Sequence, residues 1–147
     1  MIIKFWGVRG SLPTPGVDFN KYGGNTSCVE LQVDGRTIIF DMGSGLKNLG
    51  DHLKKNNISG FTIFISHFHY DHTCGLPFFS PAYDPKTSFK VYAGILQTRE
   101  KTHKVLNAQI SSPSFPITVN DFNANIEYED FEVGKPFLLQ DAINVKT

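Results

Sequence analysis

The sequence has few cysteines and no long apolar run. Its two cysteines, Cys28 and Cys74, lie far apart and form no paired spacing, so a disulfide framework is not expected. A reducing cytoplasm is the simplest compartment for such a chain. No apolar stretch approaches the roughly 20 residues that span a bilayer, and the N-terminal apolar run is too short for a secretory signal. We therefore expect a cytoplasmic protein with no membrane partner.

Net charge is also lacking. Fourteen basic and fourteen acidic side chains cancel, so the sequence carries no global electrostatic footprint for a long nucleic acid. A small phosphorylated ligand remains compatible with this balance. With 147 residues, 40% of them hydrophobic and 19% charged, the chain is expected to form a single folded domain over residues 1–147.

One six-residue segment concentrates metal-binding side chains. It reads His-Phe-His-Tyr-Asp-His and follows the apolar run Phe61–Ser66 directly. Alternate residues of an extended chain point the same way, so His67 and His69 can share one cation. Where the chain then bends, Asp71 and His72 can turn toward a second cation, and two such cations can activate a water for hydrolysis. The segment predicts a dinuclear metal site, the alternative being a surface histidine patch.

The pattern along the chain predicts a layered α/β domain. Asp34-Gly35 is a strong hairpin signal, leucines at helical spacing predict a helix over about 44–55, and Gly7–Asn25 is expected to be a long ordered loop. A second helix is expected over Ile95–Ile110. The expected strands are Ile2–Trp6, Thr26–Val33, Arg36–Phe40, Phe61–Ser66, Phe89–Ala93, Ile126–Phe131, Pro136–Leu139 and Ile143–Val145.

The histidine segment resembles the metal motif of the metallo-β-lactamase fold hydrolases. The resemblance extends over most of the chain, to the segments Phe5–Gly16, Tyr22–Cys28, Phe40–Gly45 and Gly75–Phe79. These segments are similar to one branch of that superfamily, which includes bacterial cyclic-nucleotide phosphodiesterases and, more distantly, tRNA 3′-end-processing ribonucleases. The resemblance implies an α/β (α+β) fold, an αββα sandwich with the metal site at one edge of its two sheets.

The resemblance also implies roles for single residues. His67 and His69 would bind the first metal, and Asp71 and His72 the second. Asp71 could in addition orient the proton of the nucleophile, which makes it the catalytic candidate. Asp41 matches an aspartate that supports the metal ligands from behind, and its alternative is a turn-forming aspartate before Gly43. No substrate-binding residue is assigned.

The sequence departs from the family in one respect. The family supplies further ligands downstream: a third histidine, an aspartate that bridges both metals, and a last histidine. Beyond His72 the only histidine is His103, in a predicted helix with no second ligand near it. A catalytic zinc usually has three protein ligands, so the motif alone holds too few donors for two metals. We therefore expect the N-terminal part of a longer domain, an incomplete sandwich without the later ligands.

The implied function is a dinuclear phosphodiesterase that cleaves a cyclic nucleotide or another small phosphodiester through a metal-activated hydroxide. Zinc is the default metal, and His and Asp ligands also accept manganese or iron. One alternative is an ester, lactone or thioester hydrolase on the same site. Another is a catalytically silent fragment or scaffold, whose last strands would present edges that favour a homodimer. A diiron enzyme that uses oxygen is disfavoured, because the motif that this type resembles has a glutamate at the position of His69.

Four residues after the motif have two interpretations each. Phe78, Phe79 and Tyr83 could stack on a nucleobase, although phenylalanine is common and usually belongs to the core. Cys74 could be a metal ligand, but a small buried hydrophobic residue is the simpler interpretation.

Overall fold

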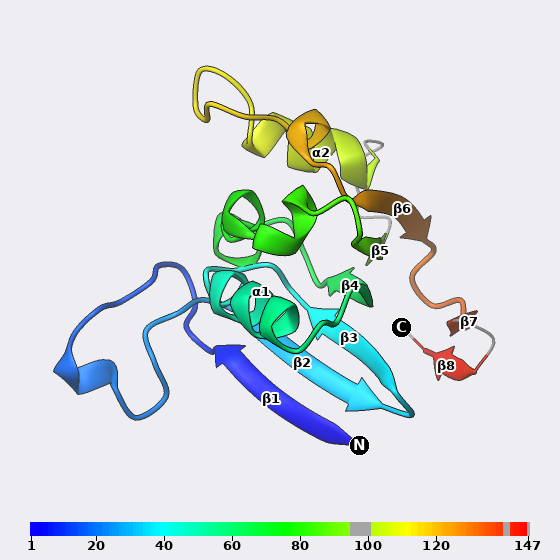
Figure 1. Ribbon diagram of the computed structural model, residues 1–147, viewed down its shortest axis with the longest axis horizontal. Coiled ribbons are helices and arrows are strands. Elements are labelled where there is room, and N and C mark those ends of the chain that lie inside the picture. The colour runs from blue at the N-terminus through cyan, green and yellow to red at the C-terminus, as the bar shows by residue number, and fades with distance from the viewer. Residues whose placement is uncertain (95–100, 140–141, 147) are drawn as a thin grey trace.

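A six-stranded mixed sheet forms the centre of the molecule (Figure 1). The structure is a computed structural model that describes residues 1–94, 101–139 and 142–146. The strands follow one another in sequence order. Neighbours among the first three strands pair antiparallel, and from the third to the sixth strand the neighbours pair parallel. They are β1 Ile2–Gly7, β2 Cys28–Val33, β3 Arg36–Phe40, β4 Gly60–Ile65, β5 Ser88–Gly94 and β6 Asn125–Phe131.

The predicted hairpin joins β2 to β3. Asp34 and Gly35 both have positive φ values, 48° and 74°, as a type I′ turn requires, and Val33 pairs with Arg36 across it. The turn fixes the register in which Ile39 faces Glu30. Local turn chemistry thus sets how the first strands are aligned.

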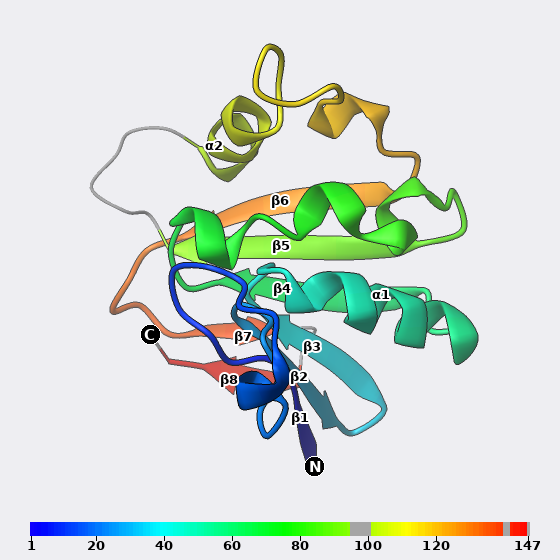
Figure 2. The same cartoon turned by 90° about the vertical axis from the view of Figure 1, so that its left-hand side faces the viewer.

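Helices cover one face of this sheet (Figure 2). The predicted first helix is confirmed as α1, Gly45–Lys55, and its three leucines at helical spacing are fully buried. The helical segments are α1, α2 Thr102–Gln109, and short 3₁₀ helices at Val17–Phe19, Tyr70–His72, Leu76–Phe78, Ser80–Tyr83 and Val119–Asp121. No helix in the part of the chain that the structure describes is long and apolar enough to cross a membrane.

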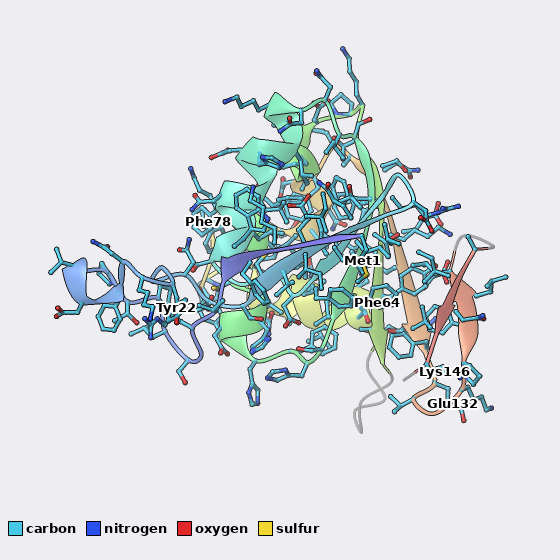
Figure 3. All side chains as sticks on the ribbon, turned by 90° about the horizontal axis from the view of Figure 1, so that it is seen from below. Met1, Tyr22, Phe64, Phe78, Glu132 and Lys146 are labelled. Carbon is cyan, nitrogen blue, oxygen red and sulfur yellow. The ribbon has the colours of Figure 1, made fainter. Side chains whose placement is uncertain are left out.

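A small second sheet lies on the opposite face. Strands β7 Phe137–Leu139 and β8 Ile143–Val145 pair antiparallel with each other. Leu139 is buried with Ile38, Phe64 and Tyr92 of the large sheet. Seen from below, the large sheet stands between the helices and this hairpin (Figure 3). The predicted α/β class is confirmed, with a helical layer, a large sheet and a small two-stranded sheet.

Two expected elements differ from the structure. Thr26 was expected in a strand but precedes β2, because its hydroxyl accepts a hydrogen bond from Ser44 N–H and its own N–H donates to Ser44 Oγ. These bonds tie Thr26 to the start of α1 instead of to the sheet. Of the expected helix Ile95–Ile110, residues 95–100 lie outside the described residues, and α2 begins at Thr102.

Candidate metal centre

The histidine segment follows β4 at the edge where β3 and β4 both end. The ring centroids of His67 and His69 lie 4.5 Å apart, and those of His67 and His72 lie 4.1 Å apart. Asp71 Oδ2 lies 3.5 Å from His72 Nε2. The fold therefore brings the four predicted ligands side by side, at the carboxyl ends of parallel strands, where open α/β sheets place their sites.

Asp41 connects this cluster to the sheet. It comes directly after β3 and is buried, and its φ of 65° turns the chain sharply. Oδ1 accepts hydrogen bonds of 2.8 Å from both Ser66 N–H and Ser66 Oγ. Oδ2 lies 2.9 Å from the donor Ser27 Oγ and 2.8 Å from His72 Nδ1. One carboxylate thus holds the end of β4 and one of the histidine rings.

These contacts determine which ring nitrogens are free. The carboxylate of Asp41 can only accept, so His72 Nδ1 carries a proton, and in the neutral ring Nε2 is the nitrogen with the lone pair. Ser66 Oγ donates to Asp41, so it accepts from His67 Nδ1 at 3.1 Å, and His67 Nε2 also keeps its lone pair. A carboxylate behind a histidine is the arrangement that fixes metal-binding tautomers. The donor chemistry therefore fits a divalent cation.

The charges of the cluster fit a cation as well. A hydrogen bond of 2.7 Å from Ser11 N–H holds the pKa of Asp71 below its usual range, so the carboxylate is ionised at neutral pH. Burial, together with the neighbouring rings of His72 and His69, lowers the pKa of His67. Its ring is then neutral at pH 7, the form that binds metals.

Backbone contacts hold the motif against the end of β3. Met42 N–H donates to His72 C=O at 2.7 Å, and Gly75 N–H donates to Met42 C=O at 2.8 Å. From α2, Gln109 Nε2 donates to Phe68 C=O at 2.8 Å. The motif is thus held at both ends by neighbouring segments.

Several supporting residues were not predicted. Ser66 directly precedes the motif, and that adjacency was its only signal. Ser11 and Ser27 lie in two segments that carry the family resemblance, which was their only signal, whereas nothing in the sequence around Gln109 indicates a contact with the motif.

The described residues supply a limited number of donors. Among them, no group of three or more His, Cys, Asp or Glu side chains is arranged to hold one metal ion. His103 lies apart, with its ring 5.1 Å from that of Tyr128, and His52 packs its ring 5.1 Å from that of Trp6. The cluster thus consists of His67, His69, Asp71 and His72, with the ring of His67 slightly nearer to that of His72 than to that of His69.

The side chains after the motif lie in different environments. Phe79 is fully buried, so its interpretation as a core residue is confirmed and a stacking role for it is wrong. Tyr83 donates its hydroxyl to Pro77 C=O and packs its ring against Phe122. Phe78 is exposed, and Cys74 is partly buried, with Sγ 3.7 Å from Thr26 Oγ1.

Sequence and structure comparisons place the chain among known proteins. Among curated relatives, it is 31% identical over 142 residues to a ribonuclease Z of Pyrococcus abyssi, covering 89% of this chain and 42% of that protein. It is 26% identical over 141 residues to a ribonuclease Z of Haloarcula marismortui, covering 90% of this chain and 42% of that protein. The chain thus spans about two fifths of the length of these relatives.

Solved structures share the fold. The metallo-beta-lactamase fold protein YhfI from Bacillus subtilis superposes with a TM-score of 0.61 at 14% identity, over 94% of this chain and 49% of that one. A diphosphatase from the PhnP family superposes with a TM-score of 0.51 at 21% identity, over 78% of this chain and 40% of that one. Residues 22–133 match the family model described as the metallo-beta-lactamase superfamily. Because that match covers most of the chain, the protein belongs to the metallo-beta-lactamase superfamily.

Proposed function

We propose that the protein is a metal-dependent hydrolase, a dinuclear phosphodiesterase that acts on a cyclic nucleotide or another small phosphodiester. One observation carries the proposal: His67, His69, Asp71 and His72 lie side by side where β3 and β4 end, with Asp41 behind His72. The relatives named ribonuclease Z support the reaction type, since a ribonuclease breaks phosphodiester bonds.

We assign each residue a role that its contacts support. His67 and His69 would hold one divalent cation and Asp71 and His72 the other, with zinc as the first choice and manganese or iron as alternatives. When bound, the two cations would supply an activated water and neutralise charge on the phosphoryl oxygens. Asp41 keeps the proton of His72 on Nδ1, and Asp71, ionised and held by Ser11 N–H, orients the proton of the attacking water.

The balanced charge of the chain favours a small substrate over a long nucleic acid.

Two other functions compete with the phosphodiesterase. A carboxylic ester, lactone or thioester could be hydrolysed on the same cluster. The chain could also be a catalytically silent scaffold, with a homodimer as one form. The limited number of donors is the observation on its side, because neither proposed donor pair reaches three ligands.

A side-by-side assay separates these functions. We expect the protein in excess Zn²⁺, Mn²⁺ or Fe²⁺ to cleave bis(4-nitrophenyl) phosphate faster than 4-nitrophenyl acetate. A preference for the acetate would support the acyl hydrolase, and no turnover of either compound with any of the three metals would support the scaffold.

His69→Ala tests the assignment of the ligands. We expect it to abolish metal-dependent turnover of the phosphodiester, because it removes one of two donors in its pair. His103→Gln is the matched control, since His103 lies on α2 away from the cluster, and it should keep the wild-type rate. A near-normal rate for His69→Ala would refute the assignment.

A further inference from the structure

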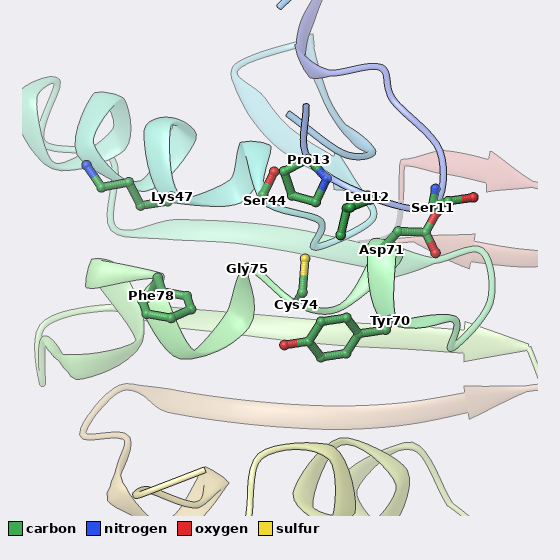
Figure 4. A pocket seen from close by; sticks show the side chains of 10 residues that line it. All are labelled: Ser11, Leu12, Pro13, Ser44, Lys47, Tyr70, Asp71, Cys74, Gly75 and Phe78. Carbon is green, nitrogen blue, oxygen red and sulfur yellow. The ribbon is translucent and has the colours of Figure 1, made fainter. Parts of the chain in front are cut away.

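A cavity opens beside the metal cluster. It has a volume of about 420 Å³, within the roughly 300–1,000 Å³ of small-molecule sites. Three segments meet around it: the loop after β1, the start of α1, and the stretch from Tyr70 to Phe78 (Figure 4). Asp71 belongs both to its wall and to the candidate ligands. A molecule in this cavity would therefore reach the cluster directly.

The walls are apolar and partly formed by rings. Figure 4 shows Leu12 and Pro13 on one side, Tyr70 and Phe78 on the other, and Cys74 between them. Leu12, Tyr70 and Phe78 are 70%, 65% and 59% exposed, although each is a large apolar side chain. A group of exposed apolar side chains around a concave site is typical of a surface that binds a ligand.

The ring of Phe78 is held in position. Phe78 meets the ring of Phe115 edge-on, with the ring centroids 5.8 Å apart. This contact supports the Phe78 ring at the cavity wall, while its exposed face stays available for stacking. A positioned aromatic surface suits a flat ligand group.

The polar groups lie at separate places along the cavity. Lys47 lines it from α1 and pairs its Nζ with Asp51 at 2.8 Å, whereas Asp71 belongs to the metal cluster. We propose that this cavity binds the nucleobase of a small nucleotide, stacked against Phe78 and Tyr70, while the attached phosphate lies at the metal cluster. The place of the phosphate rests on the phosphodiesterase function proposed above, whereas binding of the base does not.

Two ligands that differ only in the base test the proposal without turnover. Calorimetric titration of the protein with adenosine 5′-monophosphate and with ribose 5-phosphate should show about tenfold tighter binding of the nucleotide. Phe78→Ala and Tyr70→Ala should each remove most of that difference. Phe78→Leu keeps apolar bulk, so an intermediate loss would identify stacking. Tyr22→Ala is the control, because Tyr22 is an exposed aromatic residue outside the cavity.

Nuclear magnetic resonance locates the bound base. In amide spectra, the nucleotide should shift Cys74 and Gly75 of the cavity wall more than ribose 5-phosphate does. Equal affinities for the two ligands, or an equal loss in Tyr22→Ala, would overturn the proposal. A trinucleotide that binds tighter than the mononucleotide would assign the base to an RNA end, and equal binding would assign it to a small nucleotide.

A kinetic comparison separates this proposal from the function itself. The ratio of kcat/KM for thymidine 5′-(4-nitrophenyl) phosphate to that for methyl 4-nitrophenyl phosphate should fall about tenfold in Phe78→Ala. If both compounds are cleaved with no preference for the nucleoside, base binding is refuted and the phosphodiesterase function stands. If neither is cleaved while the nucleotide still binds more tightly, the function is refuted and the base site stands.

Discussion

At the scale of the residue, Asp41 combines an unfavourable backbone with a fully used side chain. A left-handed conformation is unfavourable for most residues and is tolerated best by glycine, asparagine and aspartate. At φ 65° the carboxylate reaches Ser66, Ser27 and His72 at once. The alternative interpretation of Asp41, as a turn-forming residue alone, therefore leaves most of these contacts unexplained. The free-energy cost of the strained backbone at Asp41 is offset by these side-chain contacts, which support the candidate ligands.

Asp41→Asn tests this support with little change in shape. An amide that donates from the Oδ2 position would require His72 Nδ1 to accept, which places the ring proton on Nε2, the nitrogen that faces Asp71. We expect metal affinity to fall about 10- to 100-fold. Competition with a chromogenic chelator measures it. Asp51→Asn is the control, because Asp51 pairs with Lys47 on the exposed side of α1. Unchanged affinity in Asp41→Asn would contradict the role of the carboxylate.

The two cysteines should differ in reactivity. Cys28 is fully buried, and its burial, followed by the nearby carboxylates of Asp41 and Glu30, raises the pKa of its thiol. Since the thiolate is the reactive form, this group stays unreactive as the pH rises to 8. Cys74 lines an open cavity. We expect Ellman's reagent to titrate one thiol in the native protein and two in guanidinium, and Cys74→Ser to remove the native signal. Two reactive native thiols would contradict the packing of Cys28.

At the scale of the element, the site depends on how closely two turns approach. The turn after β3 and the turn after the histidine segment exchange backbone hydrogen bonds through Met42. A Cβ on Gly75 would lie 2.1 Å from Gly43 C=O, and one on Gly43 would lie 2.3 Å from Asp71 C=O. Only glycine lets these backbones come together. Both glycines lie within the segments that resemble the family.

Gly75→Ala should therefore destabilise the protein. The added methyl group meets backbone atoms that cannot move aside, so we expect a loss of about 3 kcal/mol in the free energy of unfolding. Urea denaturation followed by circular dichroism measures it. At Gly60 the same substitution meets nothing within 4 Å, and Gly60→Ala should change stability by less than about 1 kcal/mol. Similar losses in the two variants would contradict the close approach.

Elements set by local patterns were predictable. The leucines of α1 and the Asp34-Gly35 turn act through neighbours in sequence, so periodicity and turn chemistry identified both. Thr26 was misassigned because its partner, Ser44, lies 18 positions away. Likewise Gln109 reaches Phe68 across 41 positions, which no local pattern encodes. The candidate ligands were predictable as a motif, whereas the residues that orient them depend on tertiary packing.

At the scale of the whole molecule, the layers determine where the site can form. The helices cover one face of the large sheet, and β7 with β8 covers part of the other, over Ile38, Phe64 and Tyr92. Toward the β1 edge, Ile3 and Phe5 are 53% and 66% exposed. The cluster lies where β3 and β4 end, and all four candidate donors come from the one segment that follows β4.

Metal content is the quantity that this arrangement predicts for the 147-residue polypeptide. In the proposed assignment, His67 with His69 and Asp71 with His72 would offer two donors per cation, whereas a catalytic zinc usually has three protein ligands. We expect fewer than one zinc per chain to survive gel filtration in chelator-treated buffer, as measured by inductively coupled plasma mass spectrometry. Binding should nevertheless appear in excess metal and be reduced in His69→Ala, which leaves Asp71 and His72 in place, with His103→Gln unchanged. Two ions retained per chain would show that four side chains suffice, and the argument from donor number would then be wrong.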